Sequence, residues 1–193
     1  MTLDATQDNL IVGVIGAGAM GRGIAQVAAT GGCSVKLFDT RKEATKEAIG
    51  FIEGMFNRAV EKERMTIDEV KSAVGHLHAT SSMSDFSDCH VIIEAAVENL
   101  DIKRKIFAEL ESIVADDVVL ASNTSSLSIT TIASKCKNPE RVAGFHFFNP
   151  VPLMKLVEVI NGIRTNPKVT DFLFELGKRM GRVPVRVADA PGF

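Results

Sequence analysis

A histidine and a glutamate interrupt two apolar stretches late in the sequence. His146 lies between phenylalanines at the end of a strand predicted over 141–147, and Glu158 is the one carboxylate in a strand predicted over 156–160. A carboxylate inside an apolar strand is costly unless it is paired, and a histidine is its natural partner. Such a pair suits general base catalysis, because the carboxylate fixes the imidazole tautomer and raises the basicity of the other ring nitrogen. A hydrogen-bonded core histidine is the structural alternative.

A run of small hydroxyl and amide residues, 122–126, follows a strand predicted over 117–121. These side chains can cap the short helix predicted over 129–134, with Ser126 or Ser128 as the cap. They can also donate hydrogen bonds to a bound carbonyl or hydroxyl group. Since five such residues exceed what one cap needs, we expect both roles.

Three glycines spaced G-x-G-x-x-G follow the apolar run 11–15 and precede a helix predicted over 22–30. Gly16 allows the sharp turn, Gly18 lets the backbone approach a pyrophosphate, and Gly21 lets the helix lie close to the strand. The N–H groups at the helix start then face the phosphates. The segment therefore predicts a dinucleotide-binding turn, with a tight turn of another α/β protein as the alternative.

The next predicted strand, 34–38, ends in Asp39. A carboxylate at this place accepts hydrogen bonds from the ribose hydroxyls of an adenosine, and its charge repels a 2′-phosphate. NAD is therefore expected rather than NADP. Arg41 keeps NADP open as the alternative, because a nearby arginine can accommodate the extra phosphate.

Two charged residues follow the buried strand predicted over 89–95, where the ligand crevice of a doubly wound sheet lies. Glu98 and Lys103 are therefore candidate cofactor contacts, although such charges also cap helices.

A pair of helices predicted over 41–75 forms a hairpin, and Thr66 with Glu69 makes a capping box at the start of its second helix. Its surface is either a solvated flank or a contact for a long substrate or a partner.

These elements predict an α/β fold with a doubly wound, mainly parallel sheet and a helical hairpin inserted after the second strand. A helix is expected over 166–182. The predicted strands cover 11–15, 34–38, 76–80, 89–95, 117–121, 141–147, 156–160 and 183–187.

Composition excludes several function classes. The 193 residues carry a net charge of −2 with both signs interspersed, which gives no sign of a nucleic-acid surface. No apolar run reaches membrane-spanning length, and the start of the chain lacks the apolar segment of a secretory signal. Three dispersed cysteines indicate a reducing cytoplasm. His76 and His78 have a chelating spacing but no third ligand nearby, so no metal site is expected.

Four segments carry a resemblance to a known family, and the match runs in order along almost the whole chain from residue 10. These segments are 16–21 (GAGAMG), 92–99 (IIEAAVEN), 122–127 (SNTSSL) and, most specifically, 146–159 (HFFNPVPLMKLVEV). The sequence resembles the short-chain 3-hydroxyacyl-CoA dehydrogenases, particularly those acting on 3-hydroxybutyryl-CoA. The resemblance implies an oxidoreductase of fatty-acid or butanoate metabolism. Its expected reaction is the reversible, NAD-dependent oxidation of an (S)-3-hydroxyacyl-CoA to the 3-ketoacyl-CoA.

The resemblance also implies residue roles. His146 matches the general base, Glu158 the carboxylate that orients it, Ser125 the serine that contacts both substrate oxygen and cofactor, and Lys62 a coenzyme A contact. The implied cofactor contacts are Gly16, Ala17, Gly18, Ala19, Met20, Gly21, Asp39, Glu98, Lys103, Ser125 and Asn149.

The implied domain organisation is an NAD-binding Rossmann domain over 1–188, with 189–193 beginning a connection to a helical domain absent from this chain. In the family that second domain forms a homodimer and helps bind the acyl-CoA substrate, and the family's catalytic asparagine would lie just past residue 193. A dinucleotide-binding module without turnover is therefore one alternative. A related dehydrogenase with a lysine base is another, and the histidine–glutamate pair argues against it.

Overall fold

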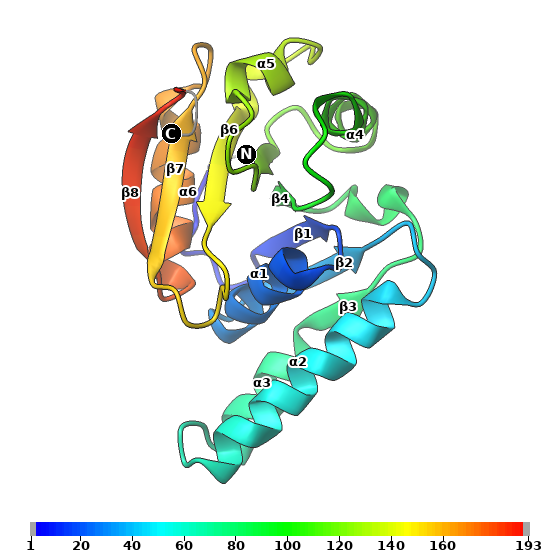
Figure 1. Cartoon of the computed structure of the whole chain (residues 1–193), viewed down its shortest axis with the longest axis vertical. Coiled ribbons are helices and arrows are strands. Elements are labelled where there is room, and N and C mark those ends of the chain that lie inside the picture. The colour runs from blue at the N-terminus through cyan, green and yellow to red at the C-terminus, as the bar shows by residue number, and fades with distance from the viewer. Residues whose placement is uncertain (1–2, 191–193) are drawn as a thin grey trace.

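The computed structural model describes residues 3–190, which form an eight-stranded sheet with helices on both faces (Figure 1). The strand order is β3-β2-β1-β4-β5-β6-β7-β8. Only the β6–β7 pair of this sheet is antiparallel, which confirms the predicted doubly wound, mainly parallel architecture. The strands are β1 (Ile11–Ile15), β2 (Ser34–Phe38), β3 (Leu77–Ala79), β4 (Val91–Glu94), β5 (Val119–Ser122), β6 (Val142–Phe147), β7 (Leu156–Asn161) and β8 (Val183–Ala188).

The helices follow the predicted pattern and differ mainly at their ends. They are α1 (Ala19–Thr30), α2 (Ala44–Glu61), α3 (Ile67–Gly75), α4 (Leu100–Ile113), α5 (Ile129–Ala133) and α6 (Pro167–Arg179). Two short 3₁₀ helices, η1 (Met83–Phe86) and η2 (Pro139–Arg141), have no counterpart among the predicted elements. Both are too short for a periodic apolar pattern to reveal them.

Each face of the sheet has its own hydrophobic core. Alternate strand residues such as Val14 and Phe145 pack against α1, α2, α3 and α6 on one face. Their neighbours, such as Ile92 and Leu120, pack against η1, α4 and α5 on the other. Because both faces are covered, the central strands β4 and β5 are apolar except at their last residues, Glu94 and Ser122.

Helices α2 and α3 form the predicted hairpin, which extends away from the sheet (Figure 1). The capping box at the start of α3 is confirmed. The Thr66 hydroxyl oxygen accepts from the Glu69 N–H at 3.2 Å, and the Glu69 carboxylate accepts from the Thr66 N–H at 2.7 Å. This cap satisfies N–H groups that the first turn of a helix leaves without partners.

The connection predicted over 189–193 lies mostly outside the described residues. Within them, the Asp189 carboxylate accepts hydrogen bonds from the Ser128 hydroxyl and from the Ile129 and Thr130 N–H groups at the start of α5. Burial alone would raise the pKa of Asp189, but these bonds, with one from the Thr130 hydroxyl, hold the pKa below its ordinary value. None of the helices within residues 3–190 has the length and apolar character needed to cross a membrane.

Candidate active site

The glycine turn joins β1 to α1 as the sequence predicts. Gly16 has a φ of 96°, and a Cβ there would lie 2.5 Å from the Ala95 carbonyl oxygen. At Gly21 a Cβ would lie 1.7 Å from the Gly16 carbonyl oxygen, so only glycine lets the helix approach the turn this closely. At Gly18 a Cβ would meet nothing within 4 Å. Gly18 is also the N-cap of α1 and provides no side-chain cap, so the turn offers open space and main-chain donors to an anion.

Asp39 lies beside this turn, at the end of β2. Its carboxylate accepts from the Ala17 N–H and from the Arg41 N–H, each at 2.8 Å. The Arg41 guanidinium is 3.8 Å away and largely exposed. Two main-chain bonds thus fix the carboxylate beside the glycine turn, where it could accept a hydrogen bond from a ligand.

A cavity of about 800 Å³ opens next to Asp39 and the glycine turn. Its apolar lining includes Phe38, Met83, Ile102 and Ile106, which suits the flat ring of an adenine. No sequence pattern singles out these four residues as part of a binding site. Met83 belongs to the unpredicted η1, and the two isoleucines look like ordinary residues of an amphipathic helix.

His146 and Glu158 face each other across β6 and β7, where they are direct partners in the strand register. His146 Nδ1 lies 2.8 Å from a Glu158 carboxylate oxygen, so the predicted contact is confirmed. The side chains are 14% and 19% exposed, so the pair is partly open to solvent and lies outside the core. The Phe148 ring lies beside the imidazole, with 4.6 Å between ring centroids.

Small polar residues after β5 form hydrogen bonds to neighbouring segments. The Asn123 side-chain oxygen accepts from the Phe147 N–H at 2.9 Å, which ties the segment to the end of β6. Ser128 caps α5 by accepting from the Thr131 N–H, so of the two predicted caps it is Ser128 that acts. Ser125 is exposed and donates its N–H to Glu98 at 2.9 Å. The cap of α5 therefore comes from Ser128, just beyond the run 122–126, and Ser125 within the run stays exposed.

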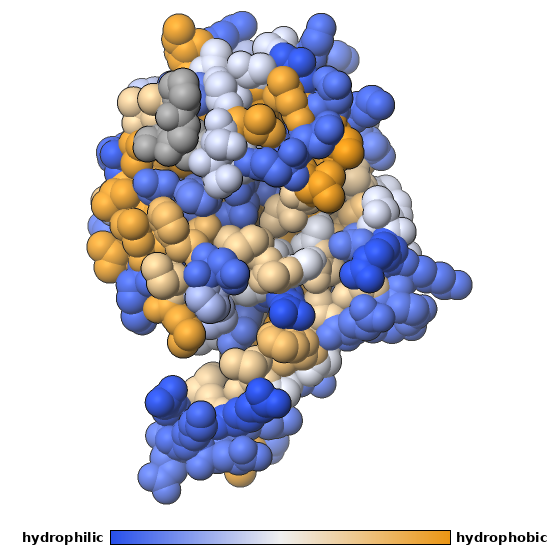
Figure 2. Space-filling model, viewed as in Figure 1, coloured by the Kyte–Doolittle hydropathy of each residue, from blue (hydrophilic) through white to orange (hydrophobic). Residues whose placement is uncertain are grey.

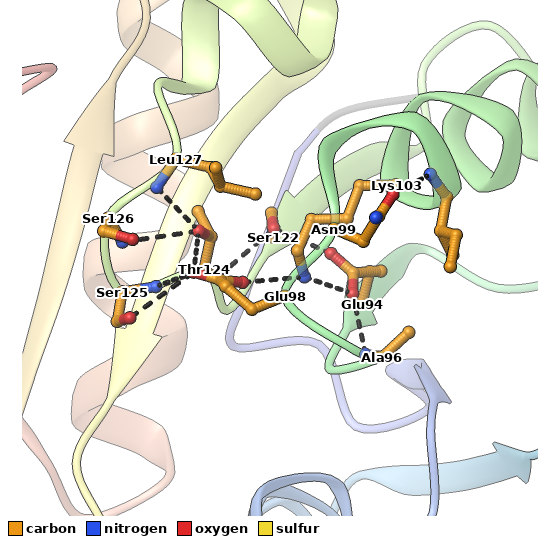
Figure 3. Close-up of polar contacts among 11 residues, drawn as sticks. Glu94, Ala96, Glu98, Asn99, Lys103, Ser122, Thr124, Ser125, Ser126 and Leu127 are labelled. Carbon is orange, nitrogen blue, oxygen red and sulfur yellow. Dashed lines mark hydrogen bonds and ion pairs between the residues drawn. The ribbon is translucent and has the colours of Figure 1, made fainter.

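Behind Ser125 lies a network that the sequence did not reveal as a unit (Figure 3). The Glu94 carboxylate, with no exposure, accepts from the Lys103 ammonium, the Ser122 hydroxyl and the Ala96 N–H, each at 2.7 Å. Lys103 also lies 3.3 Å from Glu98. Glu98 in turn accepts from the Thr124 hydroxyl at 2.5 Å. The network joins β4, α4 and the segment after β5.

The electrostatics of Glu98 follow from these contacts. Burial alone would raise the pKa of Glu98, but hydrogen bonds from Thr124, Ser125 and Lys103 outweigh it and hold the pKa below its ordinary value. Glu98 is 40% exposed, whereas Lys103 is 1% exposed. Glu98 can therefore meet a ligand, while Lys103 stays behind it; the structure favours a positioning role for Lys103 over a direct cofactor contact.

Most of the predicted site residues lie at one edge of the sheet, and Lys62 does not. The glycine turn, Asp39, Glu98, Ser125 and the exposed Asn149 follow the carboxyl ends of β1, β2, β4, β5 and β6, and His146 is the last residue but one of β6. Lys62 is the C-cap of α2, at the tip of the hairpin. Figure 2 shows mostly hydrophilic residues gathered over that tip, away from the sheet. Among residues 3–190, no three His, Cys, Asp or Glu side chains are arranged to hold a metal ion.

Comparison with known proteins decides the family. The model of the 3-hydroxyacyl-CoA dehydrogenase NAD-binding domain matches residues 11–190. The chain belongs to this family. A probable 3-hydroxybutyryl-CoA dehydrogenase of Deinococcus radiodurans is 43% identical over 181 residues, which cover 94% of the chain and 65% of that relative. The 3-hydroxyadipyl-CoA dehydrogenase of Escherichia coli is also 43% identical, over 94% of the chain and 38% of that relative.

Solved structures of 3-hydroxyacyl-CoA dehydrogenases agree with this assignment. The 3-hydroxybutyryl-CoA dehydrogenase of Escherichia coli superposes with a TM-score of 0.94 at 42% identity, over 97% of this chain and 40% of the other. The (S)-3-hydroxybutyryl-CoA dehydrogenase of Ralstonia eutropha superposes with a TM-score of 0.92 at 39% identity, over 95% of this chain and 65% of the other. The chain therefore has the NAD-binding fold of this dehydrogenase family and spans about two thirds or less of these relatives.

Proposed function

We propose that this domain binds NAD and serves the reversible oxidation of an (S)-3-hydroxyacyl-CoA to the 3-ketoacyl-CoA. The observation that carries the proposal is the His146–Glu158 contact at the sheet edge that also holds the glycine turn and Ser125. Three features fit the cofactor: open space at Gly18, the fixed Asp39 carboxylate, and the adjacent apolar cavity. When bound, the nicotinamide accepts the hydride.

The chain's own residues handle the proton. Glu158 accepts the Nδ1 proton of His146, which leaves Nε2 as the nitrogen that takes the substrate's hydroxyl proton. The carboxylate then stabilises the imidazolium that forms. Ser125, held through its N–H by Glu98, donates its hydroxyl to the substrate oxygen and keeps that oxygen in line with the base. The proposed substrate is an acyl-CoA, and we propose Lys62 as a contact for its coenzyme A part. As the family resemblance implies, the whole protein is proposed to be a homodimer.

A simple assay tests the proposal. Acetoacetyl-CoA is added to the chain with NADH, and the decay of NADH absorbance is followed. Decay that depends on both reagents supports the proposal. A chain that binds NADH without turnover would instead act as a nucleotide-binding module.

Asp39 is expected to make the site prefer NAD over NADP. In Asp39→Ser the repulsion of a 2′-phosphate is lost and Arg41, 3.8 Å away, becomes available to it. We expect the affinity for NADPH relative to NADH to rise about tenfold. The measurement is the dissociation constant of each nucleotide by fluorescence titration. Asp39→Ser with Arg41→Ala is the matched control and should lose most of the gain. An unchanged ratio in Asp39→Ser would refute the role of the carboxylate.

A further inference from the structure

The network behind Ser125 carries an unbalanced charge. Lys103 Nζ lies 2.7 Å from Glu94 and 3.3 Å from Glu98, so one ammonium is shared by two carboxylates. The Ser122 hydroxyl accepts from the Thr124 N–H and therefore donates its own proton to Glu94. All the partners described above for Glu94 are donors, which is the environment of an ionised carboxylate. Two negative charges and one positive charge leave the network with a net charge of −1.

This charge lies where the fold would place the nicotinamide half of a dinucleotide. In a doubly wound sheet the pyrophosphate sits at the glycine turn and the two nucleoside halves extend to opposite sides of it. Asp39 lies on the β2 side, and the apolar cavity extends from there to the segment after β4 and the first turns of α4. Glu98 and Ser125 follow β4 and β5 on the other side of the turn, and Glu94 is the last residue of β4 (Figure 3). A nicotinamide ring is positively charged when oxidised and neutral when reduced.

We propose that Glu94 is a specificity-determining residue whose buried charge makes the nucleotide site favour the oxidised cofactor over the reduced one. The inference rests on the proposed function. Lys103 needs only one carboxylate for a neutral pair, and Glu94 and Glu98 supply two. Because Glu94 has no exposure, solvent and salt screen its charge less than they screen a surface carboxylate. Glu94 does not touch the ligand; it acts through the field it adds to Glu98.

The test compares variants by their net charge. Glu94→Gln removes a carboxylate deep in the network, and Glu98→Gln removes the carboxylate at its open edge, so each brings the net charge to zero. Glu94→Gln with Lys103→Met restores −1 without the ion pair. For each, the dissociation constants of NAD⁺ and NADH are measured on the full chain by calorimetry. We expect the ratio of the NADH constant to the NAD⁺ constant to fall about threefold or more in both single variants. It should return to within about twofold of the wild-type ratio in the double variant.

A second buried ion pair provides the control. Arg141 and Glu111, 3.4 Å apart and 4% and 6% exposed, lie at the amino end of β6, far from the glycine turn. Glu111→Gln should lower the melting temperature and leave the nucleotide ratio unchanged. If Glu94→Gln alone does not fold, the inference is tested on the other two variants. The ratio of the NADH constant to the NAD⁺ constant should then fall in Glu98→Gln and stay near the wild-type value in the double variant.

Each other outcome overturns the inference. A ratio that stays constant across the series, or that shifts equally in Glu111→Gln, would refute it while leaving the proposed function intact. A double variant that shifts further than Glu94→Gln would show a structural role instead. A wild-type chain that binds neither nucleotide would overturn both this inference and the proposed function.

Discussion

Replacing His146 with glutamine is expected to lower kcat for acetoacetyl-CoA reduction by about 10²–10⁴-fold, the usual contribution of a general acid or base. Glutamine keeps a polar group opposite Glu158 but cannot carry the proton between substrate and solvent. NADH binding should stay within about twofold of the wild type, since the proposed mechanism has the imidazole contact the reacting oxygen and not the phosphates. Steady-state absorbance assays and NADH fluorescence titration measure the two quantities.

The matched control for this variant is His78→Gln, an exposed histidine on β3 at the far side of the sheet. It should leave both kcat and NADH binding unchanged. A His146→Gln protein that keeps its kcat would remove the base from the proposed mechanism. A variant that loses NADH binding and kcat together would place His146 among the cofactor contacts instead.

The second large effect is expected at the glycine turn, where two alanine variants should behave differently. Gly21→Ala puts a methyl group 1.7 Å from the Gly16 carbonyl oxygen, so the turn must move. We expect a loss of about 3 kcal/mol in unfolding free energy and no measurable nucleotide binding. Gly18 has extended backbone angles and no atom within 4 Å of a Cβ, so Gly18→Ala should fold normally. It should nonetheless bind NADH about 10- to 100-fold more weakly, because the methyl group takes the space of a phosphate.

Gly54→Ala on α2 is the reference for both variants. It also has nothing within 4 Å of a Cβ, and alanine in a helix interior is more stable than glycine by about 0.5–1 kcal/mol. Urea denaturation and NADH titration on the three variants give the comparison. Normal NADH affinity in Gly18→Ala would show that the nucleotide does not approach the turn there.

Much of the fold could be predicted because local chemistry and long-range structure agree. The bounds of β2 and the capping box of α3 follow from short patterns, and the structure has both as predicted. The His146–Glu158 contact could be predicted because a carboxylate among aliphatic residues requires a partner. The first two features depend on residues close together in the sequence. The third follows from the free-energy cost of burying an unpaired carboxylate.

The network around Glu94 could not be predicted in the same way. In the sequence, Glu94 is a residue near the end of the apolar strand predicted over 89–95, and Lys103 is a charge near the start of a helix. Their pairing depends on how α4 returns over the end of β4, which no local pattern encodes. The same holds for Met83 and Ile102, whose shared cavity forms only when η1 and α4 are both in place. The sequence indicated which residues carry charge, and tertiary packing decided which of them are buried.

The antiparallel pairing of β6 and β7 affects the order in which parts of the chain can fold. His146 and Glu158 are separated by 12 positions, whereas the contacts from Ala17 to Asp39 and from Glu94 to Ser122 span 22 and 28. Closing a shorter loop loses less chain entropy, and local pairings form sooner than parallel ones that need a crossover. The His146–Glu158 contact can therefore form within a single hairpin, before the crossovers that bring Ala17 to Asp39 and Glu94 to Ser122, so the two parts of the candidate site would arise at different stages of folding.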